Sequence, residues 1–141
     1  MGDKVKVLVV DDDQRMVKTI CDILRIKGYE TVPAYCGEEA VEKVKVDNTD
    51  CVLMDIKMPG IDGVEALRMI KERVPELPVL LMSAYATREQ AEEAKRLGAC
   101  AVLAKPADLQ LLLSFLSLFR KEKEVLIVDA EKLRALLGET Y

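Results

Sequence analysis

The sequence predicts an α/β fold, a three-layer doubly wound sandwich built around a parallel sheet of five strands. Two observations predict it. Short runs rich in Val, Ile and Leu recur along the chain, and segments with apolar residues at helical spacing separate them. Runs of four or five apolar residues are typical of strands buried on both faces. Strands that alternate with helices indicate repeated βαβ units with right-handed crossovers.

Five apolar runs are the predicted strands. They lie at about 5–10, 30–34, 51–54, 79–83 and 100–103. β-branched and aliphatic residues dominate these runs, as expected for strands that helices cover on both sides.

Four helices are predicted between these strands. The first three show apolar residues at helical spacing, namely Val17-Ile20-Leu24, Ala40-Val41-Val44 and Val64-Leu67-Ile70. Thr87 followed by Gln90 is typical of a capping box, which would begin the fourth helix. That helix has little to bury beyond two alanines and Leu97. It is either an element that shifts between two packings or an ordinary amphipathic helix.

The segment after Ala107 carries two apolar stripes at helical spacing. Leu109, Leu112, Leu113, Leu116 and Phe119 form a stripe that can pack on the sheet, and Leu111, Phe115 and Leu118 form a second on nearly the opposite face. A helix that is apolar on both sides is usually covered on both sides. The cover could be a second copy in a two-fold homodimer or the chain's own tail around 125–137. Alternatively, the chain is a piece of a longer protein and the tail is a linker. Asp129 is placed to cap a last short helix.

Composition excludes several kinds of site. The 141 residues carry a net charge of −4 and include no histidine, and the four cysteines contain no CxxC pair. Zinc sites and histidine-based catalysis are therefore not expected. No basic patch for nucleic acid and no apolar run of membrane-spanning length is visible. We therefore expect a cytoplasmic protein that binds neither nucleic acid nor membranes.

Carboxylates follow two of the predicted strands directly. Asp11 and Asp12 come after the first strand and Asp55 after the third. Because parallel strands end at one edge of a sheet, we expect these side chains to lie together where α/β sheets bind ligands. Three adjacent carboxylates repel one another, which favours a bound hard cation. Asp13 is better explained as a helix cap.

A hydroxyl and an ammonium group lie at the ends of two further strands at this edge. Ser83 ends the fourth strand and Lys105 follows the fifth. Oxygen ligands beside hydrogen-bond donors are what Mg²⁺ and a phosphoryl group need together.

At these residues the sequence resembles the receiver domain of two-component response regulators, including those of chemotaxis. The matching motifs occur in the family's order and spacing: Val7 to Asp13 (VLVVDDD), Met54 to Gly63 (MDIKMPGIDG), Ser83-Ala84 and Ala104-Lys105-Pro106. The resemblance implies the flavodoxin-like strand order 2-1-3-4-5. It also implies a receiver domain over residues 4–121 and a C-terminal extension or linker over 122–141.

The resemblance implies a role for each site residue. Asp55 would accept a phosphoryl group from a sensor histidine kinase. Asp12, Asp55 and the backbone carbonyl of Lys57 would bind Mg²⁺, with Asp11 acting largely through metal-bound water. Ser83 and Lys105 would contact the phosphoryl oxygens, and the Lys105–Pro106 bond would be cis. Such a chain is a phosphoacceptor that signals to an unknown downstream protein by contact, and not an enzyme acting on other substrates.

One position departs from the family pattern. Three residues before Lys105, where the family usually has Tyr or Phe, this chain has Val102. Switching would then rely on Ser83 and its loop, or Tyr85 would supply the aromatic ring. Two other functions are weighed against the phosphoacceptor: a pseudo-receiver that binds partners without phosphorylation, and a haloacid-dehalogenase-type phosphatase. The intact acid set disfavours the first, and the poor nucleophile motif at 11–15 disfavours the second.

Overall fold

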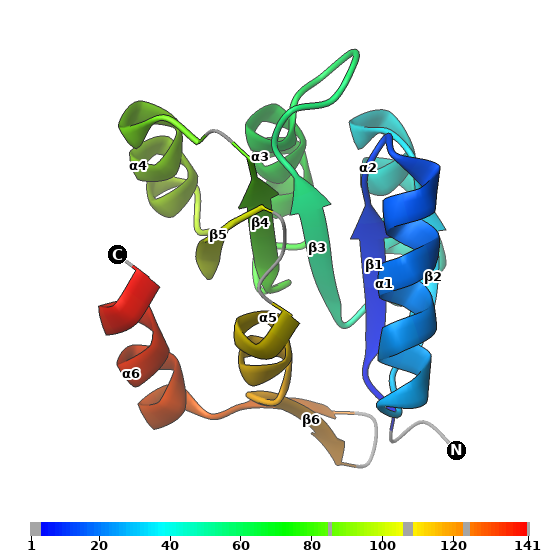
Figure 1. Cartoon of the computed structure of the whole chain (residues 1–141), viewed down its shortest axis with the longest axis vertical. Coiled ribbons are helices and arrows are strands. Elements are labelled where there is room, and N and C mark those ends of the chain that lie inside the picture. Colours follow the sequence, from blue (N-terminus) through cyan, green and yellow to red (C-terminus); the bar gives the residue numbers. More distant parts are fainter. Residues whose placement is uncertain (1–3, 85, 106–108, 123–124, 141) are drawn as a thin grey trace.

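The sheet is the expected one. The computed structural model describes residues 4–84, 86–105, 109–122 and 125–140. Five parallel strands lie in the order β2-β1-β3-β4-β5 (Figure 1). Their bounds are β1 Lys6–Val10, β2 Glu30–Ala34, β3 Cys51–Asp55, β4 Val79–Ser83 and β5 Ala101–Ala104. Every residue of β3 and β4 is buried, because these two strands lie at the centre with a neighbour on each side.

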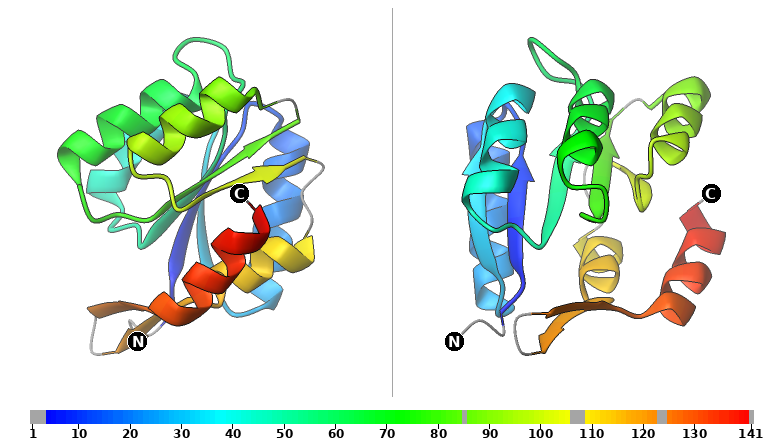
Figure 2. Two further views of the ribbon diagram at one scale, coloured as in Figure 1. Left: turned by 90° about the vertical axis from the view of Figure 1, so that its left-hand side faces the viewer. Right: turned by 180° about the vertical axis from the view of Figure 1, so that it is seen from behind.

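Helices cover both faces of this sheet, which confirms the three-layer sandwich (Figure 2). The five that follow the strands are α1 Gln14–Ile26, α2 Gly37–Val46, α3 Gly63–Arg73, α4 Arg88–Arg96 and α5 Leu109–Leu116. Side chains of α1 and α5 belong to one apolar cluster, and those of α2, α3 and α4 to the cluster on the other face.

Side-chain caps fix where three of these helices begin. Asp13 accepts hydrogen bonds from the backbone N–H groups of Arg15 and Met16, as predicted. Asp62 caps α3, and Thr87 with Gln90 forms the predicted capping box of α4. Each cap satisfies N–H groups that have no partner within the helix. The loops at the carboxyl edge therefore enter these helices at defined points.

The chain after α5 forms an antiparallel hairpin and a further helix. Strands β6 Phe119–Glu122 and β7 Val125–Val128 pair with each other, and α6 Ala130–Thr140 follows. Asp129 accepts a hydrogen bond from the Lys132 N–H at 3.1 Å, which confirms the predicted cap. The expectation that Phe119 continues the helical stripe of α5 is wrong, because α5 ends at Leu116 and Phe119 begins β6.

The second stripe of α5 is not a free surface in the single chain, and a homodimer through it stays a prediction. Phe115 is 0% exposed and Leu118 is 1% exposed. Leu126, Leu133 and Leu136 of the tail pack against the same cluster, so the tail folds back over it. Of the alternatives considered for this stripe, covering by the chain's own tail is the one observed. A dimer through Phe115 and Leu118 would require the tail to leave.

A polar contact ties the hairpin to the amino edge of the main sheet. Lys121 of β6 forms an ion pair with Asp50 at 3.3 Å. The other contact of the same carboxylate oxygen is the backbone N–H of Lys6, at 2.9 Å. Both charged side chains are largely buried. The hairpin is therefore fixed next to the start of β1 and β3.

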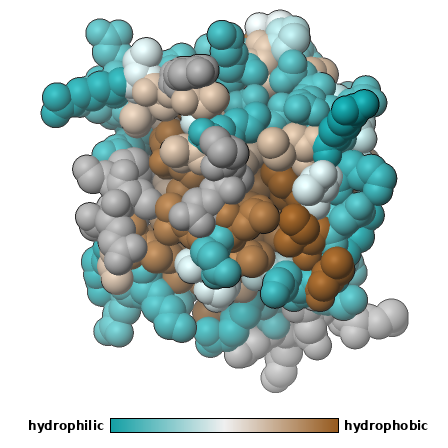
Figure 3. Space-filling view, in the orientation of Figure 1, coloured by the Kyte–Doolittle hydropathy of each residue, from teal (hydrophilic) through white to brown (hydrophobic). Residues whose placement is uncertain are grey.

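The face of the molecule that is seen in Figure 1 carries both polar and apolar residues. In the orientation of Figure 1, hydrophobic residues gather near the centre and hydrophilic ones surround them (Figure 3). Among the described residues, no helix is long and apolar enough to cross a membrane.

Burial of Phe115 predicts a large loss of stability on truncation. Phe115→Ala should lower the free energy of unfolding by about 3–5 kcal/mol, because it leaves a cavity in a closed core. Ile26→Ala is the matched control, since Ile26 is 82% exposed; its effect should stay within about 0.5 kcal/mol. Urea denaturation measures both. A loss below about 1 kcal/mol for Phe115→Ala would contradict the core position.

Candidate functional site

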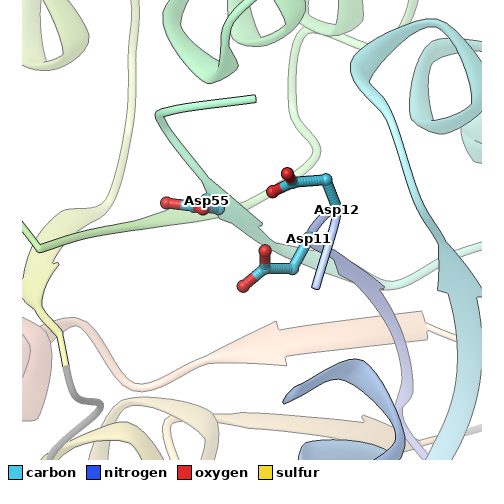
Figure 4. A group of neighbouring side chains, drawn as sticks. All are labelled: Asp11, Asp12 and Asp55. Atoms are coloured by element: carbon cyan, nitrogen blue, oxygen red, sulfur yellow. The ribbon is translucent and has the colours of Figure 1, made fainter. Parts of the chain in front are cut away.

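Three carboxylates meet at the carboxyl edge of the sheet. Asp11 and Asp12 follow β1, and Asp55 is the last residue of the neighbouring strand β3 (Figure 4). Each offers an oxygen, and these oxygens all lie within 4.8 Å of one another. Asp11 and Asp55 are 1% and 6% exposed, whereas Asp12 is exposed. The sequence prediction that these acids come together is confirmed.

Lys105 bridges the two buried acids. Its Nζ donates to Asp11 Oδ2 at 2.6 Å and to Asp55 Oδ2 at 3.1 Å. A buried carboxylate is strongly destabilising without a partner, so one ammonium group between two of them offsets much of that penalty. The backbone N–H of Lys105 also donates to the Ser83 carbonyl at 2.8 Å, which joins the ends of β4 and β5.

Backbone contacts hold the acids in place. The Asp11 N–H donates to the Ala34 carbonyl at 3.2 Å, and the Asp13 N–H donates to Asp11 Oδ1 at 3.0 Å. Asp11 thus cannot rotate without breaking contacts on both sides. Asp13 serves the site through this N–H, and its side chain caps α1, as predicted.

Gly63 allows α3 to begin directly against the end of β3. A Cβ at this position would lie 2.3 Å from the Asp55 carbonyl oxygen and 2.7 Å from the Ile56 Cα. No side chain fits there, since both neighbours are backbone. The loop from Asp55 to Gly63 consequently closes tightly, with the Gly63 N–H donating to the Ile56 carbonyl at 2.6 Å.

A cavity of about 490 Å³ opens beside Asp55. It is lined by Asp55, Ile56, Lys57, Met58, Asp62, Ser83, Ala84, Thr87, Gln90 and Lys105. Two predicted site residues with different exposure share its wall, since Lys57 is exposed and Ser83 is buried. The cavity gives solvent and small anions a path to Asp55 that Asp11 does not have.

The charge cluster shifts the pKa of both Asp55 and Lys105. Burial raises the pKa of Asp55, the hydrogen bond from Lys105 opposes this, and the nearby charge of Asp11 raises it again. Burial lowers the pKa of Lys105, but hydrogen bonds to Asp11 and Asp55 outweigh burial and raise it. The ammonium is thus strongly retained, while the ionised form of the acid is disfavoured.

Sequence reasoning brought the principal site residues together but missed two. Thr87 and Gln90 line the cavity, although the capping box had fully explained them. The signal that could have found them is their distance along the chain, four and seven residues after Ser83, at the N-cap and in the first turn of the helix that follows β4. The predictions for Tyr85 and for the Lys105–Pro106 bond lie outside the described residues.

Fold and site together define a flavodoxin-like α/β domain with an acid–lysine cluster at its topological switch point. The model of the response regulator receiver domain matches residues 7–117. The chain belongs to this family, whose members are signalling domains of two-component systems.

Two curated relatives show the range of proteins in which such a sequence occurs. The transcriptional regulatory protein ZraR of Klebsiella oxytoca is 44% identical over 116 residues, which are 80% of this chain and 26% of that protein. The sporulation initiation phosphotransferase F of Bacillus subtilis is 36% identical over 74% of this chain and 84% of its own length. The chain spans about a quarter of the length of the ZraR proteins it matches.

Solved structures agree on the fold. A CheY-like receiver domain protein from Methanospirillum hungatei superposes with a TM-score of 0.79 at 26% identity, over 96% of this chain and 98% of that one. A chain of the CheX–CheY–BeF3–Mg complex from Borrelia burgdorferi gives 0.72 at 34% identity, over 77% of this chain and 84% of that one.

The raised pKa of Asp55 predicts how stability depends on pH. A folded chain that holds a proton more tightly than the unfolded chain loses stability as the pH rises through the interval between the two pKa values. Asp55→Asn should therefore be more stable than wild type at pH 7 without metal. This difference should shrink as the pH falls through the folded-state pKa of Asp55.

Denaturant titration at several pH values in a chelating buffer measures this difference. Asp13→Asn is the control, because Asn caps a helix about as well as Asp and the residue is exposed. Its stability at pH 7 should match wild type within about 0.5 kcal/mol. The assignment would be wrong if Asp55→Asn were the less stable protein at pH 7.

Proposed function

We propose that Asp55 accepts a phosphoryl group from a phosphohistidine on a sensor histidine kinase. The observation that carries the proposal is the position of Asp55, which is largely buried yet faces an open cavity and has an ammonium group 3.1 Å away. The 36% identity to a sporulation phosphotransferase supports the same role. Asp11 is the other buried carboxylate of the cluster, but it does not line the cavity, which makes it a weaker acceptor.

The three acids fit Mg²⁺. Oxygens within 4.8 Å of one another can converge on a small hard cation, and carboxylates are ligands that Mg²⁺ prefers. Asp12 and Asp55 would bind it directly with the Lys57 carbonyl, and Asp11 would act largely through water. The ion would supply positive charge beside the transferring group. The similarity to the CheX–CheY complex of Borrelia burgdorferi, which contains BeF3 and Mg, supports this fit.

The chain's own residues then account for the transfer. A bond forms between an Asp55 carboxylate oxygen and phosphorus, and the bond from phosphorus to the donor's imidazole nitrogen breaks. Asp55 needs no general base because it attacks as a carboxylate. The Lys105 ammonium balances charge on the phosphoryl oxygens, and the Ser83 hydroxyl lies on the same cavity wall to donate to them.

The proposal extends to domains and partners. Residues 4–121 would be the receiver and 122–141 its extension, although the β6–β7 hairpin has residues on both sides of this boundary. Output would pass through protein contact. That this chain binds no nucleic acid stays a prediction. The longer relatives named ZraR are transcriptional regulatory proteins, and this chain matches about a quarter of their length.

The acceptor role predicts a covalent adduct. Incubation with Mg²⁺ and acetyl phosphate should add one phosphoryl group, seen by intact mass spectrometry. The adduct should be absent in Asp55→Asn and present in Asp62→Asn, which alters another acid of the same cavity. It should form more slowly in Lys105→Met by about tenfold or more, because a charge-stabilising group is lost.

Other outcomes identify the rival functions. A folded protein that forms no adduct with several phosphodonors would indicate a pseudo-receiver. Rapid turnover of unrelated phosphoesters would indicate a phosphatase. An adduct that persists in Asp55→Asn would assign the acceptor to another residue.

The metal site predicts stabilisation by Mg²⁺. At ten times its Kd the ion should raise the free energy of unfolding by about 1.4 kcal/mol, because it binds the folded chain alone. Asp12→Asn should abolish most of this gain while changing metal-free stability little, since Asp12 is exposed. Thermal or urea unfolding with and without Mg²⁺ measures it. An equal gain in Asp12→Asn and wild type would place the ion elsewhere.

A further inference from the structure

The helix α6 covers part of the main domain. It contacts β5, the strand at the edge of the sheet, and lies beside α5 on the same side of the sheet (Figure 2). Leu133 and Leu136 of α6 pack against the apolar cluster that contains Leu103 of β5 and Phe115 of α5. The helix α6 thus packs on β5 and on the apolar cluster to which α5 contributes.

The packing of α6 is shallow compared with that of α1. Leu133 and Leu136 are only partly buried, and Glu131, Lys132, Arg134 and Ala135 are exposed. On the same side of the sheet, α1 buries four side chains almost completely. An element held by few buried apolar contacts separates at a smaller free-energy cost than one held by many.

Strand β5 links the packing of α6 to the charge cluster. Successive residues of a strand face opposite sides of the sheet, and Val102 accordingly packs in the cluster with α4, while Leu103 packs in the cluster with α6. Lys105 follows Ala104, the last residue of β5, and holds Asp11 and Asp55. A change in the position of Lys105 therefore acts on the strand that supports α6.

We propose that α6 is an intramolecular ligand of the β5–α5 face, and that phosphorylation of Asp55 releases it. The inference rests on the proposed function of Asp55. Released, the face would present Leu103 of β5 and the apolar residues around it for contact with another protein. The rest of the tail stays in place because Lys121 of the hairpin is paired with Asp50, which lies at the amino end of the central strand β3.

Charge supplies the reason for release. Without a phosphoryl group, Lys105 donates at 2.6 Å to Asp11, at the end of β1, and at 3.1 Å to Asp55. A phosphoryl group on Asp55 adds negative charge on the cavity side, and Lys105 lines that cavity. Its ammonium is then drawn from Asp11 toward the new oxygens, and the end of β5 moves with it. The helix α6 packs against β5 as β5 lies without the phosphoryl group. A shift of β5 would therefore weaken the packing of α6.

Hydrogen exchange measured by mass spectrometry tests the coupling in the full chain. The probe is BeF3⁻ with Mg²⁺, a stable mimic of the phosphoryl group. Amides of α6 should exchange at least about fivefold faster when the probe is bound, whereas those of α1 should not. Leu133→Gln/Leu136→Gln should exchange rapidly in α6 with or without the probe.

Linkage gives a second readout. If the bound probe raises the equilibrium constant for release of α6 by some factor, release of α6 must raise the affinity for the probe by the same factor. Leu133→Gln/Leu136→Gln should therefore bind BeF3⁻ more tightly than wild type by that factor. Lys132→Gln/Ala135→Gln alters exposed positions of the same helix and should match wild type in both measurements.

The two proposals fail in different ways. If the probe binds, as shown by slower exchange in residues 56–62, and α6 exchange in wild type is unchanged or slower, the release is overturned while the acceptor role stands. If the probe does not bind at all, the proposed function fails, and the coupling fails with it. The wild-type comparison does not depend on the folding of any variant.

Discussion

The ion pairs of Lys105 with Asp11 and Asp55 are the interaction on which this site depends. Two carboxylates that are almost fully buried share one ammonium group at 2.6 and 3.1 Å. Removing that group would leave two like charges without compensation in a low-dielectric region. The strand order explains why the pairing is possible. The strands β1 and β3 are neighbours, and β5, which is parallel to them and separated from β3 by β4 alone, ends at the same edge of the sheet. The strand order therefore brings the three charged side chains together, and the ion pairs in turn allow the two acids to be buried.

This balance also leaves the site ready for change. The cluster holds three acids against one partly buried lysine, and the pKa of Asp55 is raised by its burial. A cation among the acids, or an anion beside Lys105, would each redistribute the same charges. Because Lys105 immediately follows β5, such a redistribution acts on a strand whose two faces pack against different helices, α4 through Val102 and α6 through Leu103. Since Val102 stands where the family usually has an aromatic ring, the contact of Leu103 with α6 is the one through which we propose that β5 acts.

The strands, the caps and the acid set could be predicted from the sequence because each rests on local information. A buried strand requires an apolar run, Asp13 and Thr87 lie next to the N–H groups they cap, and Asp11 and Asp55 directly follow the apolar runs. The fate of Phe115 and Leu118 could not be predicted in this way. Helical periodicity showed two apolar faces, but the end of α5 at Leu116 and the pairing of β6 with β7 depend on contacts distant along the chain.

By itself, the sequence determined which groups are available: three carboxylates, a hydroxyl and a lysine at strand ends, in an order that specifies a parallel sheet. The tertiary structure alone decided that Asp11 and Asp55 share Lys105, that Thr87 and Gln90 reach the cavity, and that the tail covers α5. The physical reason is range. Propensity, capping and periodicity act over a few residues, whereas charge compensation and burial depend on which distant segments meet, as Lys105 and Asp11 do across 94 residues of chain.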